Sequence, residues 1–79
     1  MVPSPITQVF RVQLPLSDNL SHPEIRQYQG NLNIFCLIWS EMNKSNDVLD
    51  AIIDCINKLN ELVPILCEPN TYGEVEIIL

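Results

Sequence analysis

One histidine and three cysteines are the side chains of this 79-residue chain best suited to chemistry. A thiolate beside an imidazole can act as a nucleophile, and three thiolates with one imidazole can hold zinc. Structural zinc ligands usually come in pairs about two to four residues apart, whereas the two nearest thiols here are twelve positions apart. We therefore expect buried structural thiols, no enzymatic activity, and no catalytic, cofactor-binding or metal-binding residue. A small thiol or zinc protein is the alternative that would use His22, Cys36, Cys55 and Cys67.

Four carboxylates on a predicted helix are the second candidate. Asp47, Asp50, Asp54 and Glu61, here named the acidic ridge, fall within an arc of about 60° at 3.6 residues per turn. No glycine-bearing calcium loop accompanies them, which excludes an EF-hand. Asp50 and Asp54 repel each other one turn apart, with only Lys58 to relieve them. We interpret the ridge as a surface that docks a basic patch on another protein; a purely solvated helix face is the alternative.

The formal net charge of −6 lies entirely in residues 31–79, which hold two lysines and eight acidic residues. A field of this sign repels a phosphate backbone and attracts a basic protein, so we expect a protein partner and no direct nucleic-acid binding. The longest apolar run is six residues, too short to span a membrane. The N-terminal segment MVPSPITQVF has no basic start or long apolar run, and the cysteines are odd in number. These features indicate a cytoplasmic protein with reduced thiols.

The segment NLNIFCLIW (31–39) fits two structures. As a strand, it places Phe35, Leu37 and Trp39 on one face, which we interpret as an apolar partner-binding surface. As a helix, it continues a stripe that begins at Ile25. Gly30 costs about 1 kcal/mol inside a helix, and the β-branched and aromatic residues suit a pleated surface, so the strand is the prediction.

The remaining elements follow from periodicity. Residues 8–14 alternate as a strand; the capping-box-like stretch SHPE (21–24) opens a short helix near 22–29, closed by Gly30. Residues 46–62 form a long amphipathic helix, capped by Ser45 or Asn46 and stopped by Pro64. Residues 63–67 and 74–79 are expected to pair as a hairpin.

The predicted fold is a single α+β domain over residues 1–79, with residues 1–6 loose. A small three- or four-stranded sheet carries helix 46–62 on one face and the short helix 22–29. The alternative is a mainly α helical hairpin, 22–43 and 46–63, closed by a terminal β element. The layout, with QYQGNL (27–32) and VEIIL (75–79), resembles small ribonuclease inhibitors of the barstar kind over about a third of the chain. We transfer no residue role from that resemblance.

A strand that is apolar on both faces needs cover on both, and one helix covers only one. We therefore expect the rest to come from a homodimer or a larger partner. The expected function is a small acidic, non-enzymatic, intracellular protein-binding module that occludes its partner, as an inhibitor, antitoxin, immunity or anti-defence protein does. A structural or assembly subunit is the alternative.

Overall fold

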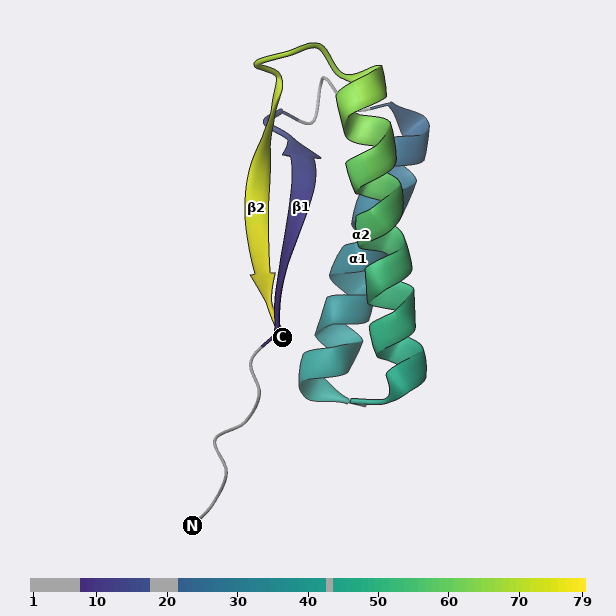
Figure 1. Ribbon diagram of the computed structural model, residues 1–79. Helices are drawn as coiled ribbons and strands as arrows, with labels where there is room; N and C mark the ends of the chain where they lie inside the picture. Colours follow the sequence, from purple (N-terminus) through teal and green to yellow (C-terminus); the bar gives the residue numbers. More distant parts are fainter. Residues whose placement is uncertain (1–7, 18–21, 43) are drawn as a thin grey trace.

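The chain forms a small α+β domain in which a two-stranded sheet packs against a helical hairpin (Figure 1). The computed structural model describes residues 8–17, 22–42 and 44–79. Along the chain the elements are β1 (Val9–Pro15), α1 (Pro23–Glu41), α2 (Asn46–Leu66) and β2 (Tyr72–Ile78). The residues expected to be loose, 1–6, lie outside the described part. The element order is strand–helix–helix–strand, so the layout that resembled the barstar kind is not the one observed.

Helix α2 is the central element, because it packs against both α1 and β1. The Oγ of Ser45 accepts a hydrogen bond of 3.2 Å from the backbone N–H of Val48, and Asp47 lies in the positively polarised first turn. This confirms the predicted start of the helix. The side chains expected on its apolar side form most of the buried core: Ile52, Cys55, Ile56, Leu59 and Val63.

The predicted stop of α2 at Pro64 is wrong, because the helix continues to Leu66. A proline inside a helix removes one hydrogen bond and crowds the preceding turn, at a cost of about 3 kcal/mol. Continuing the helix buries Val63 completely and brings Cys67, which is 7% exposed, into the core. Burial of this kind contributes about 1.5–3 kcal/mol for each large apolar side chain, which offsets the cost.

The predicted strand at residues 31–40 is also wrong. Residues 23–29 are helical, as predicted, but the helix does not end at Gly30. Both segments belong to one helix, α1, which passes through Gly30 without a break. The penalty of about 1 kcal/mol for glycine is smaller than the gain from a stripe repeated every three or four residues. That stripe buries Ile25 and Leu32 and packs Tyr28, Phe35 and Trp39 against the core. The alternative interpretation, a helical hairpin of residues 22–43 and 46–63, is therefore the one that fits these two segments.

The sheet has two strands, fewer than the three or four predicted. Strand β1, expected at 8–14, is confirmed; β2, expected at 74–79, begins at Tyr72. The predicted hairpin between 63–67 and 74–79 does not form, because residues 63–66 are helical and β2 pairs with β1 instead. The antiparallel register sets Phe10 opposite Ile77 and Val12 opposite Val75. These pairs face the helices, and Val12 is completely buried.

Asn60 of α2 closes the outer edge of β1. Its Oδ1 accepts a hydrogen bond of 2.8 Å from the backbone N–H of Gln13, and its Nδ2 donates one of 3.0 Å to the backbone carbonyl of Arg11. The carboxamide thus binds the strand as a neighbouring peptide group would. The backbone N–H of Gln13 and the carbonyl of Arg11 are thus already hydrogen-bonded, and a further strand could not pair with them.

We expect Gly30→Ala to raise the free energy of unfolding by about 0.5–1 kcal/mol, because alanine has a higher helix propensity than glycine. The position lies inside α1, and no atom lies within 4 Å of a Cβ placed there. Chemical denaturation of both proteins measures the difference. A destabilised variant would show that a neighbour touches this position in solution, contrary to the fold described.

Asn60→Ala should lower stability relative to the matched variant Asn57→Ala by about 1–2 kcal/mol. Both substitutions gain helix propensity on α2, but only the first removes two hydrogen bonds to β1. Denaturation curves of the two variants isolate the contribution of the bonds. Equal stabilities would mean that the edge of β1 is held without the Asn60 carboxamide.

Candidate protein-binding surfaces

The acidic ridge lies on the outer face of α2, opposite the core. All four carboxylates, Asp47, Asp50, Asp54 and Glu61, are exposed. The ridge spans about 21 Å at 1.5 Å per residue. In the described part of the chain, ion pairs join Arg11 to Glu74 and to Glu76, and none involves the ridge. The ridge is therefore an extended array of negative charge that is available to a partner.

The residues predicted as an apolar partner-binding surface do not share one face. Since the segment is helical, Phe35 and Trp39 lie one turn apart and pack against the core, whereas Leu37 points away from the core and is 56% exposed. Ile34, which is 57% exposed, lies near Leu37 on the outward side of α1. The apolar surface that α1 offers to solvent is thus aliphatic and smaller than a two-faced strand would expose.

The side chains that could carry chemistry are dispersed. His22 is the N-cap residue of α1 and makes no capping bond there; its Nε2 lies 2.9 Å from the carbonyl oxygen of Leu66, to which it must donate. Cys55 and Cys67 are buried as expected, whereas Cys36 is only partly buried; all three cysteines are free thiols. Among the described residues, no group of three or more histidine, cysteine, aspartate or glutamate side chains is placed to hold a metal ion.

Burial raises the pKa of the Cys36 thiol and of the Cys55 thiol above the ordinary value. For Cys55, the negative charge of Asp54 and the neighbouring Cys36 thiolate add to this effect. A raised pKa lowers the fraction of thiolate at neutral pH, and the thiolate is the reactive form. The environment of these two cysteines therefore opposes nucleophilic chemistry.

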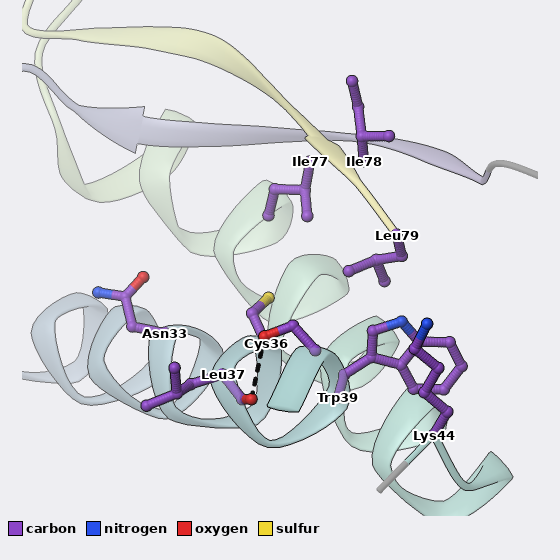
Figure 2. A pocket seen from close by; sticks show the side chains of 9 residues that line it. Asn33, Cys36, Leu37, Trp39, Lys44, Ile77, Ile78 and Leu79 are labelled. Atoms are coloured by element: carbon purple, nitrogen blue, oxygen red, sulfur yellow. Dashed lines mark hydrogen bonds between the residues drawn. The ribbon is translucent and has the colours of Figure 1, made fainter. Parts of the chain in front are cut away.

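A gap of about 500 Å³ opens between α1 and the C-terminal end of β2. Its sides are Cys36, Leu37 and Trp39 from the helix and Ile77 and Leu79 from the other side (Figure 2). Ile77 and Leu79 point toward the helix, whereas Ile78 points away from it (Figure 2). Lys44 stands at one end, close to Trp39 (Figure 2).

This gap was not expected from the sequence. The alternation in EVEIIL (74–79) correctly indicated a strand with Val75 and Ile77 on one side. Because residues 31–40 were expected to lie in the sheet, α1 was not expected opposite that side. A helical interpretation of 31–40 gives the helix face on which Cys36 lies, but not its position opposite β2, which depends on how α1 and the sheet pack.

Comparison of the chain with protein-family models, with curated proteins and with solved structures found no significant match. In the described part of the chain, no helix combines the length and the apolar character needed to cross a bilayer.

We expect Cys36 and Cys55 to react with iodoacetamide at least about tenfold more slowly in the folded protein than in concentrated guanidinium chloride, because burial and a raised pKa both disfavour the thiolate. The pH at which half-maximal rate is reached should also lie higher in the folded protein. Peptide mapping by mass spectrometry identifies which thiol is labelled. Equal rates in the two states would contradict the buried environment of Cys55 and the partly buried environment of Cys36.

Proposed function

We propose that this protein is a small acidic, non-enzymatic module that binds another protein and occludes a basic surface on it, in the manner of an inhibitor, antitoxin, immunity or anti-defence protein. The acidic ridge carries the proposal: four exposed carboxylates run along one face of α2, and no ion pair in the described residues neutralises them. The partner is a protein with a basic patch, met in the cytoplasm.

The repulsion between neighbouring carboxylates, which lowers the stability of α2, supports this interpretation of the ridge. Like charges one helical turn apart destabilise a helix by a few tenths of a kcal/mol, and Asp50 and Asp54 have this spacing. Complementary charge on a partner turns the same repulsion into attraction, raises the association rate and selects the partner. A ridge that served only solubility would gain nothing from this close spacing.

An assembly subunit that forms a homodimer is the second candidate. It is favoured by the outward side of α1, where Ile34 and Leu37 are 57% and 56% exposed and Gly30 leaves open space beside the helix. Two copies of this surface could pack across a two-fold axis. A dimer that persists in high salt and dissociates on Ile34→Glu would favour this candidate over the first.

The double variant Asp50→Lys with Asp54→Lys should lose most of its capture of the partner, because it reverses the charge at the centre of the ridge. The partner is first identified by cross-linking the wild-type protein in its native host, and capture is then quantified with purified components. The matched control Glu24→Lys with Glu68→Lys makes the same change in net charge at exposed positions outside the ridge. Equal capture by both variants and the wild type would falsify the proposed role of the ridge; circular dichroism checks that each variant folds.

A further inference from the structure

The outer edge of β2 is free in the described part of the chain. Gln8 and Leu79 exchange both backbone hydrogen bonds, at 3.2 and 2.9 Å, which sets the alternation along the strand pair. Counting back from Leu79, every second residue faces β1. The backbone N–H and C=O groups of Tyr72, Glu74, Glu76 and Ile78 therefore face away from β1. No hydrogen bond described for this edge satisfies them.

The two edges of the sheet differ. Asn60 occupies the outer edge of β1 through Arg11 and Gln13, which blocks the addition of a strand there. Among the described residues, no side chain binds the outer edge of β2 in this way. Exposed strand edges attract further strands, and proteins usually protect them. This difference makes β2 the side on which the sheet can grow.

Space for an added strand lies under this edge. The gap of about 500 Å³ is lined by α1, by Ile77 and Ile78 at the end of β2, and by Leu79 and Lys44; no residue of β1 or α2 lines it. Val75 points toward the helices, as its partner Val12 does, yet Val75 is 45% exposed whereas Val12 is fully buried. The helices thus cover β1 and leave β2 partly uncovered. An added strand would lay its apolar side chains against Val75, Ile77 and Leu37.

The opposite face of the edge is acidic. Glu74 and Glu76 share a single cation, since the Nε of Arg11 lies 3.8 Å from a carboxylate oxygen of each. All three side chains are about half exposed or more, so these ion pairs are weak and screened. One negative charge remains uncompensated beside the free backbone groups. A neighbouring strand with lysine or arginine opposite Glu74 and Glu76 would pair with it.

We propose that the β2 edge binds an extended segment of a partner protein in which basic side chains alternate with apolar ones. The segment adds a third strand to the sheet: its backbone bonds the free groups of β2, its apolar side chains fill the gap over α1, and its basic side chains meet Glu74 and Glu76. This inference deepens the proposed function, on which it rests in taking the occupant to be a protein. It concerns a different surface from the acidic ridge.

A second copy of this chain fits the edge poorly. Antiparallel pairing of two β2 strands with their centres aligned sets Glu74 or Glu76 of one copy opposite a glutamate of the other. Like charges directly opposite destabilise a strand pair. Charge therefore selects a basic segment over self-pairing.

Selection from a random decapeptide library displayed on phage, with the full chain immobilised, tests the proposal. We expect enriched sequences in which lysine or arginine alternates with apolar residues. The best peptide, made synthetically, should shift the amide resonances of Glu74 and Glu76 and slow their hydrogen exchange, while those of Asp50 and Asp54 stay unchanged. No enrichment, acidic sequences, or shifts confined to the ridge would each overturn the inference. So would concentration-dependent protection of the Glu74 and Glu76 amides without peptide, which would show that a second copy occupies the edge.

Matched variants locate the contacts. Glu74→Lys with Glu76→Lys should weaken the selected peptide by about tenfold or more, whereas Asp50→Lys with Asp54→Lys, an equal change in net charge, should leave its affinity within about twofold. Leu37→Asn should weaken it severalfold, and Ile34→Asn, equally exposed on α1 but outside the gap, should not. If both charge-reversal variants lost the same affinity for the peptide, net charge alone would explain the loss, and the proposed site at the β2 edge would be wrong.

These variants also separate the two proposals. If charge reversal in the ridge alone abolishes capture of the native partner, and no peptide binds at β2, the edge site is wrong and the proposed function stands. If only Glu74→Lys with Glu76→Lys abolishes capture of the native partner, the proposed role of the ridge is wrong and the edge site stands.

Discussion

The apolar stripe of α2 is the constraint on which the rest of the structure depends, since α1 and β1 both pack against it. A chain of this length has a stability of a few kcal/mol, comparable to the contribution of two or three fully buried aliphatic side chains. Ile52, Leu59 and Val63 are all completely buried in this stripe. Local penalties are therefore accepted wherever they allow the stripe to be covered, as Pro64 in α2 and Gly30 in α1 illustrate.

The two strands of the sheet differ in how directly they contact the apolar stripe of α2, and therefore in how firmly they are held. Two strands alone are marginal in water. Strand β1 is held by the burial of Val12 and by the Asn60 carboxamide, both of which connect it to α2. Strand β2 is held mainly through β1, and its helix-facing Val75 is 45% exposed. The element with the weakest support thus carries the free edge, and any segment that binds this edge also stabilises β2 by mass action.

Elements with a single dominant signal were predictable from the sequence. In α2, the 3.6-residue stripe, the Ser45 cap and Asp47 agree, and in residues 8–14 the alternation has no helical competitor. Residues 31–40 fit both periods, because Ile34 to Trp39 are all apolar. Local propensity favoured the strand, whereas the stripe that begins at Ile25 and packs against α2 favours the helix. The gap and the β2 edge could not be predicted, because both depend on which elements lie side by side. The ridge residues were placed on one helix face by spacing alone, and their exposure follows from the same periodicity.

The helical state of α1 also changes which forces can drive recognition. In a strand, Phe35 and Trp39 would have joined Leu37 as aromatic anchors, the residue types that dominate binding hot spots. In the helix they pack on the core, and the exposed apolar residues that line or flank the gap are aliphatic: Leu37, Val75 and Ile78. Aliphatic contacts of this size supply modest and unspecific affinity. Backbone hydrogen bonds along β2 and the charges of Glu74 and Glu76 must therefore supply the direction and the selectivity, which makes recognition at this surface depend on an extended partner and on ionic strength.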